Sequence, residues 1–216
     1  MKKTLIMLCM IIIIICSIGL KQSIKQKVIY IDPGHGGIDG GCVGIDGTFE
    51  KDLNLEISLE LKDALISLGY IVEMTRIGDY DLATKDSKNR KKDDIIKRCE
   101  LLSKGDLFVS IHCNAYPDSN VFGAQVFYSD EEEKNLALSI QNKIKEMFNN
   151  TNREINKLTN KYILENVNQI GCIVEVGFLS NNNDLNLLKD KIYRKQMALA
   201  IALGINDFIN NDFKKI

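Results

Sequence analysis

The alternation of apolar and polar positions divides the chain into strand-like and helix-like segments. Short apolar runs that stop at glycine, proline or polar residues predict buried strands, and apolar residues that recur every three or four positions predict helices. Strands are predicted at residues 27–32, 70–75, 107–112, 123–128, 162–164 and 172–176. Helices are predicted at residues 53–68, 95–102, 136–148 and 192–209. Because strands and helices alternate, we expect an α/β domain with a largely parallel sheet covered on both faces.

A polar, charge-rich stretch at residues 78–94 interrupts this alternation and is predicted to be a loop. Its basic cluster, Lys88–Lys92, is interpreted as a solvated part of that loop rather than as a binding patch. The whole chain of 216 residues has a formal net charge of -1. This balance argues against nucleic acid as a partner, because binding to phosphates needs a clear excess of basic residues.

The first 20 residues form an apolar leader. Two lysines precede a run from Leu5 to Leu20, which as a helix would span about 24 Å, slightly less than a typical hydrocarbon core. The leader is therefore either a secretory signal peptide or a short membrane anchor. No Ala-x-Ala cleavage site follows it, and Ile15 makes Cys16 a poor lipoprotein cleavage site. These features favour an uncleaved anchor.

With either kind of leader, the rest of the chain is expected to be exported. It is predicted to consist of a short polar linker at 21–26 and one domain at 27–213. Exported domains often carry disulfides, and four cysteines lie outside the leader: Cys42, Cys99, Cys113 and Cys172. Cys99 falls on a helical face and Cys172 in an apolar strand, where buried free thiols are common. We therefore predict no structural disulfide.

Three polar segments follow predicted strands: DPGHGG from Asp32, HCNA from His112 and EVGF from Glu175. In open α/β sheets, ligands collect beyond the carboxyl ends of the strands. The glycine-rich stretch Gly34–Gly41 fits neither the dinucleotide-binding fingerprint nor a P-loop, so a phosphate site is set aside. The coincidence of polar strand ends predicts a site of another kind.

Two histidines, His35 and His112, are the only ones in the chain. Taken alone, His35 would be an incidental side chain in a flexible turn, and His112 would be a hydrogen-bonded core residue. Together with Glu50, at the start of the first long helix, they complete a different pattern. Two imidazoles and a carboxylate are the protein ligands of many catalytic zinc sites, which leave a fourth position for water.

Glu175 lies within an apolar run that would normally exclude a charge. It is either one half of a buried ion pair, with Arg76 or Arg98, or a general base at the end of a strand. Cys113 adjoins His112 but would point to the opposite face of the strand, so we predict no catalytic role for it.

Four motifs carry a resemblance to a known family. DPGHGGIDGG, FEKDLNL, SIHCNA and EVGFLSN occur in this order and are similar to motifs of the zinc-dependent N-acetylmuramoyl-L-alanine amidases of the Amidase_3 type. The resemblance covers residues 27–210. It implies a single domain whose mixed, mostly parallel central sheet of about six strands is flanked by helices.

The family's zinc ligands map onto His35, Glu50 and His112, and its catalytic glutamate maps onto Glu175. The resemblance implies one Zn²⁺, and hydrolysis of the amide between N-acetylmuramic acid and L-alanine in peptidoglycan. Asn114 is expected to contact substrate or to support a metal ligand. The leader and the lack of wall-binding repeats are most similar to the spore-cortex subgroup, which implies a role in forming muramic-δ-lactam.

The same subgroup implies an exported protein, anchored to the membrane or secreted, that faces the cell wall or spore cortex. Some family members carry an inhibitory helix before the catalytic strand. Here that interval is predicted to hold one amphipathic helix and a polar connector, so we expect an open site controlled by expression or by a partner protein. Two alternatives remain: a zinc carboxypeptidase acting on stem peptides, and a non-catalytic wall-binding protein.

Overall fold

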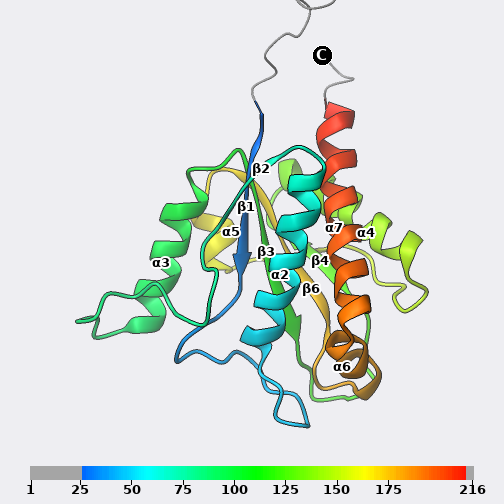
Figure 1. Cartoon of the computed structure of the whole chain (residues 1–216), viewed down its shortest axis with the longest axis horizontal. Helices are drawn as coiled ribbons and strands as arrows, with labels where there is room; N and C mark the ends of the chain where they lie inside the picture. Colours follow the sequence, from blue (N-terminus) through cyan, green and yellow to red (C-terminus); the bar gives the residue numbers. More distant parts are fainter. Residues whose placement is uncertain (1–25, 213–216) are drawn as a thin grey trace, which may run out of the picture.

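The computed structural model describes residues 26–212, which form a single α/β domain built on one six-stranded sheet (Figure 1). The strand order is β2-β1-β3-β6-β4-β5, and β4 runs antiparallel to β6 while the other pairs are parallel. The predicted mixed, mostly parallel sheet is confirmed. The strands are β1 Val28–Pro33, β2 Ile71–Met74, β3 Leu107–Asn114, β4 Gln125–Tyr128, β5 Asn156–Lys157 and β6 Ile170–Phe178.

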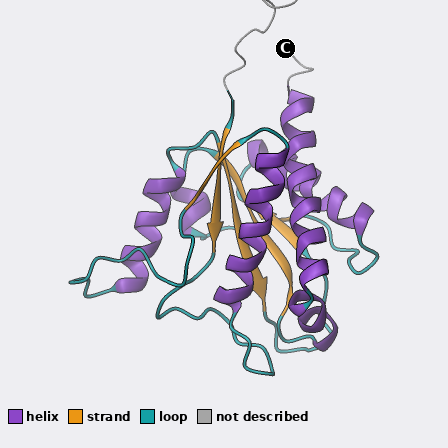
Figure 2. Ribbon diagram, in the orientation of Figure 1, coloured by secondary structure: helices purple, strands orange, loops and turns teal. Residues whose placement is uncertain are grey.

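Helices cover both faces of the sheet, as expected (Figure 2). The helices are α2 Glu50–Ser67, α3 Arg90–Leu102, α4 Glu131–Met147, α5 Tyr162–Asn166, α6 Asn182–Lys189 and α7 Lys191–Asp212. On β1, Ile29 and Ile31 join the larger core beneath α2, α4 and α7, whereas Tyr30 joins a smaller core beneath α3 and α5. This alternation follows from the two-residue period of a strand.

Two predicted elements were wrong. Residues 162–164 were expected to form a strand but begin α5, in which Ile163 and Leu164 pack into the smaller core. A three-residue apolar run has no periodicity that separates a strand from a helical turn. The loop predicted at 78–94 ends early, because α3 begins at Arg90 and the Asn89 side chain caps it by accepting the Lys92 N–H. Part of the basic cluster is therefore helical.

Two short elements were missed. Strand β5 has only two residues, both polar, and carries no apolar signal. Helix α6 begins after Asn181, whose side chain accepts the N–H groups of Asn183 and Asp184. This is a standard N-cap arrangement, but a run of three asparagines also suits a turn.

The predicted leader at 1–20 and all but the last residue of the linker lie outside the described residues. Within residues 26–212, no helix combines the length and apolarity needed to cross a bilayer. The cysteines of the described domain, Cys42, Cys99, Cys113 and Cys172, are free thiols.

Candidate metal centre and active site

His35 lies two residues after the end of β1 and has a left-handed backbone conformation, with φ of 62°. This conformation is uncommon for a residue with a side chain and needs support from its surroundings. Two buried arginines supply it. Arg98 donates to the carbonyls of Pro33 (2.7 Å) and His35 (2.6 Å), and Arg76 donates to those of Pro33 and Gly34 (both 2.9 Å). These hydrogen bonds therefore hold the turn that carries His35 in place.

Glu50 opens α2 and is only 3% exposed. Its Oε2 accepts the Cys42 N–H at 2.8 Å, and its Oε1 accepts the Cys113 N–H and the Asn54 side chain, each at 3.2 Å. The loop before the helix replaces a side-chain cap: the Cys42 carbonyl accepts the N–H of Glu50 itself. These bonds fix a buried carboxylate at a helix N-terminus, where the helix dipole favours negative charge.

His112 lies near the end of β3, at the position paired with Glu175 on β6. Its ring approaches the β1 turn so closely that a Cβ on Gly34 would lie 2.3 Å from the ring carbon Cε1. Glycine at position 34 is therefore required by contact with a site residue, and not by a positive φ.

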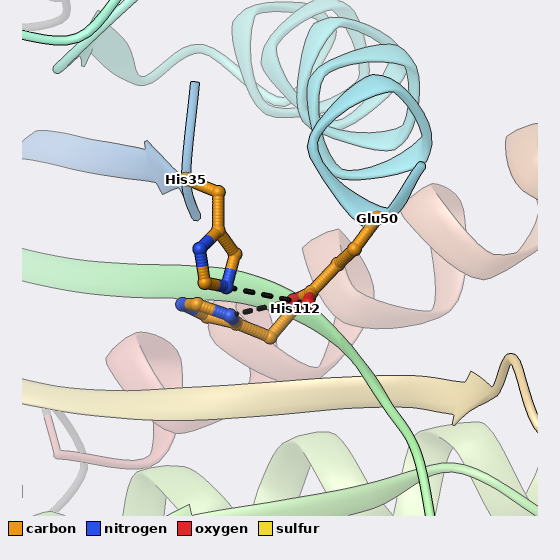
Figure 3. A group of neighbouring side chains, drawn as sticks. All are labelled: His35, Glu50 and His112. Carbon is orange, nitrogen blue, oxygen red and sulfur yellow. Dashed lines mark hydrogen bonds and ion pairs between the residues drawn. The ribbon is translucent and has the colours of Figure 1, made fainter. Parts of the chain in front are cut away.

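His35, Glu50 and His112 converge from three separate segments of the chain (Figure 3). The Nε2 atom of His35 lies 3.3 Å from Oε2 of Glu50, and Nδ1 of His112 lies 2.8 Å from Oε1. One potential ligand atom from each residue falls within 4.8 Å of the others, so the group could hold a metal ion. The other ring nitrogen of His35 lies 2.9 Å from Oδ2 of Asp39. A carboxylate behind a ligating histidine is typical of metal sites.

Electrostatics within this group reflect mutual ionic attraction. Burial raises the pKa of Glu50, but both histidines outweigh burial and hold that pKa below its ordinary value. Burial lowers the pKa of His35, but Glu50 and Asp39 outweigh it and leave the His35 pKa raised. The cluster thus places one carboxylate between two imidazoles, and the imidazoles must be neutral to act as metal ligands.

Glu175 is half-buried beside this group, and its Oε2 is inaccessible and has no hydrogen-bond partner within residues 26–212. Burial raises the pKa of Glu175, and the neighbouring Glu50 adds to the rise, against the lowering effect of His112 and Lys161. The alternative of an ion pair is wrong. Arg98 pairs with Asp32 and Asp94, and Arg76 bonds to backbone carbonyls.

Asn114 and Cys113 behave differently from the site residues. The Asn114 side chain accepts the N–H of Ala115, and its carbonyl accepts the N–H of Leu179. A contact of Asn114 with substrate stays a prediction. Cys113 is buried in the larger core on the opposite side of the strand from His112. Burial raises the pKa of its thiol, which leaves it protonated and unsuited to nucleophilic chemistry.

A cleft of about 290 Å³ adjoins the site. His35, His112 and Glu175 contribute to its wall, and it extends between α3 and the start of α5. Sequence reasoning missed Asp39, Lys91 and Lys161 in this wall. Only Asp39 carried a local signal, because it lies four positions after His35 in the same glycine-rich loop.

Comparison with known proteins gives one consistent result. The model of the family Amidase_3, described as N-acetylmuramoyl-L-alanine amidase, matches residues 29–207. The germination-specific N-acetylmuramoyl-L-alanine amidase of Bacillus subtilis (strain 168) is 40% identical over an alignment of 189 residues, with 84% of this chain and 79% of that protein covered.

Two solved structures support the same assignment. The CwlD amidase from Clostridioides difficile, in complex with the GerS lipoprotein, superposes with a TM-score of 0.83 at 36% identity, covering 87% of this chain and 100% of that one. The catalytic domain of the amidase CwlV from Bacillus (Paenibacillus) polymyxa var. colistinus gives 0.77 at 28% identity, covering 86% and 99%. The chain therefore belongs to the Amidase_3 family of N-acetylmuramoyl-L-alanine amidases.

Proposed function

We propose that this protein is a zinc-dependent amidase that hydrolyses the bond between the lactyl group of N-acetylmuramic acid and the L-alanine of the peptidoglycan stem. One observation carries the proposal. His35, Glu50 and His112 bring ligand atoms within 4.8 Å of one another, beside Glu175, whose buried Oε2 atom has no hydrogen-bond partner among residues 26–212. Family membership supplies the substrate class.

The donor set fits one Zn²⁺. Two imidazoles and a carboxylate match the three protein ligands of catalytic zinc sites, and the Asp39 carboxylate behind His35 fits the usual support of such a ligand. When bound, zinc supplies a Lewis acid for the scissile carbonyl and lowers the pKa of a water molecule to ≈ 7. Glu50, His35 and His112 would hold the ion, and the hydrogen bonds of the surrounding loops keep these three side chains in place.

Glu175 is the proposed general base. Its Oε2 atom takes a proton from the attacking water and then delivers that proton to the departing alanine nitrogen. The position suits the task, because Glu175 is the cross-strand neighbour of His112 and its Oε2 has no competing donor within the described domain. Asn114, close to the same strand ends, is proposed to orient substrate or to support His112.

The proposed cellular role is based on two relatives. One relative is germination-specific, and the CwlD amidase was solved with a lipoprotein. We propose that this enzyme acts in spore cortex maturation, where removal of the stem peptide precedes formation of muramic-δ-lactam by a second enzyme. We further propose that residues 1–20 export it and anchor it to the membrane, and that a partner protein regulates it.

Digestion of purified sacculi tests the proposal. The purified chain, in mild detergent with equimolar Zn²⁺, is incubated with sacculi, and the soluble products are analysed by mass spectrometry. An amidase releases whole stem peptides with a new L-alanine amino terminus. Shortened stems that remain attached to glycan would instead indicate a carboxypeptidase. Co-sedimentation with sacculi and no new amino termini would indicate a wall-binding protein. A chelated sample is the control.

A further inference from the structure

The cleft beside the site has an apolar floor and a wall that carries both acidic and basic side chains. Its floor includes Ile95 of α3, Ile163 of α5 and Ile173 of β6. Lys91, Lys161 and the half-exposed Tyr162 also line the cleft. At about 290 Å³ the cleft is near the lower end of the size range of ligand pockets, which suits a short segment of substrate.

The charges in this wall are not equivalent. Asp32 and Asp94 are both bonded to Arg98 at 2.7 Å, and Lys91 lies 3.3 Å from Asp39.

The ammonium group of Lys161, in contrast, has no hydrogen bond or ion pair with any residue of the described domain. It nevertheless lies within electrostatic reach of Glu175, on which its charge acts. Lys161 thus presents an ammonium group without a hydrogen-bonded partner in the described domain, in the same cleft wall as the proposed general base.

The two arms of the proposed substrate differ in charge. The lactyl carboxyl group of N-acetylmuramic acid is consumed in the scissile amide, so the glycan arm carries no negative charge. The stem peptide carries free carboxylates beyond L-alanine, the first of them on the second residue, D-glutamate, unless that group is amidated. The free ammonium group of Lys161 therefore favours the peptide arm over the glycan arm.

We propose that this cleft holds the stem peptide and that Lys161 binds a free carboxylate of the residues that follow L-alanine. The inference rests on the proposed function and makes the enzyme selective for stems whose second residue is not amidated. The apolar floor packs against the peptide, and the ammonium group forms a charge-assisted hydrogen bond with that carboxylate. Lys161 is thereby a specificity-determining residue.

A competition experiment tests this inference. Two synthetic disaccharide tetrapeptides, which differ only in a carboxylate or a carboxamide on the second stem residue, are mixed in equal amounts with the zinc-loaded full chain. Mass spectrometry of the products gives the ratio of the two kcat/KM values directly. The variants are Lys161→Met, Lys161→Arg and, as a matched control, Lys157→Met, which removes an exposed lysine of β5 that does not line the cleft.

We expect the wild-type chain to prefer the free carboxylate by roughly two- to tenfold at low ionic strength, the range of a partly exposed charge contact. The preference should disappear in Lys161→Met, persist in Lys161→Arg and Lys157→Met, and weaken with added salt. Equal cleavage of both substrates by the wild type would overturn the inference while leaving the amidase function intact. Cleavage of neither would overturn the proposed function itself.

Discussion

Glu50 illustrates how single residues build this site. Its carboxylate is almost completely buried, yet it accepts backbone N–H groups from Cys42 and Cys113 and lies against both histidines. A buried charge is tolerated only when hydrogen bonds and opposite charges compensate it. The backbone donors hold Glu50 in position whether or not a cation is present, which preorganises the site.

Replacing Glu175 by glutamine tests its role as a base. Glutamine keeps the size of the side chain but cannot accept a proton, so we expect turnover of sacculi to fall roughly 10²–10⁴-fold. Zinc content, measured by elemental analysis, should stay that of the wild type. Glu73→Gln, on the exposed edge strand β2, is the matched control and should retain full activity. Wild-type turnover in Glu175→Gln would remove this residue from the mechanism.

Replacing His112 by alanine tests the ligand set. Loss of one of three protein ligands should lower zinc occupancy after dialysis against metal-free buffer, because the remaining pair binds the ion more weakly. Elemental analysis and circular dichroism, performed on the same sample, separate loss of metal from loss of fold. Glu175→Gln, which should stay loaded, is the reference. Full occupancy in folded His112→Ala would contradict the assignment.

At the scale of elements, the site depends on the connection between β1 and α2. This connection carries His35 and the loop that caps α2. Its backbone carbonyls accept hydrogen bonds from Arg76, which follows β2, and from Arg98, which lies in α3. Arg98 also neutralises Asp32, which accepts further hydrogen bonds from Thr75 and Ser110. One arginine therefore links α3, the end of β1 and the turn that presents His35.

Arg98→Met should destabilise the fold strongly. Removing the arginine leaves the Asp32 carboxylate buried without its countercharge, which costs about 3–5 kcal/mol in comparable buried pairs. Urea unfolding monitored by circular dichroism measures the loss. The double variant with Asp32→Asn should lose less than the sum of the single variants, because the two side chains interact directly. Strictly additive losses would show that the pair is not coupled.

At the scale of the whole molecule, the parallel arrangement of β1, β3 and β6 places their carboxyl ends at one edge of the sheet. The described chain begins at the amino end of β1, which lies at the opposite end of the domain (Figure 1). An anchor preceding residue 26 would thus join the domain away from the site. This arrangement agrees with an enzyme that is held at a membrane and works on the wall outside it.

The buried ion pair between Asp32 and Arg98 makes the free energy of unfolding depend on pH in the acidic range. Burial raises the pKa of Asp32, but Arg98, Thr75 and Ser110 outweigh it and hold the folded-state pKa below the ordinary value. Asp32 therefore stabilises the fold above its unfolded pKa of about 3.9, and this contribution is lost as the pH falls through the lower folded-state value. The difference in unfolding free energy between pH 7 and pH 3 should be smaller in Asp32→Asn than in the wild type. An equal difference would contradict this linkage.

The sequence alone was sufficient to predict the alternation of long strands and helices and the polar segments at three strand ends. Long elements show their type in the sequence: α4 has a helical period because one face is buried, and β3 is a continuous apolar run because both faces are buried. Short elements do not, so α5 was mistaken for a strand and β5 and α6 were missed. Motif order also identified the family before any geometry was known.

Only the tertiary structure decided how the site residues meet and what surrounds them. It separated Glu175 from the buried arginines, brought Asp39 behind His35 and placed Lys161 in the same cleft as Glu175. Most of these contacts join residues that are far apart in the chain, and the contact between His35 and Asp39 depends on the backbone conformation of one loop. Neither kind of contact leaves a periodic pattern in the sequence. Local propensity follows from neighbours along the chain, whereas charge pairing and solvent exclusion depend on neighbours in space.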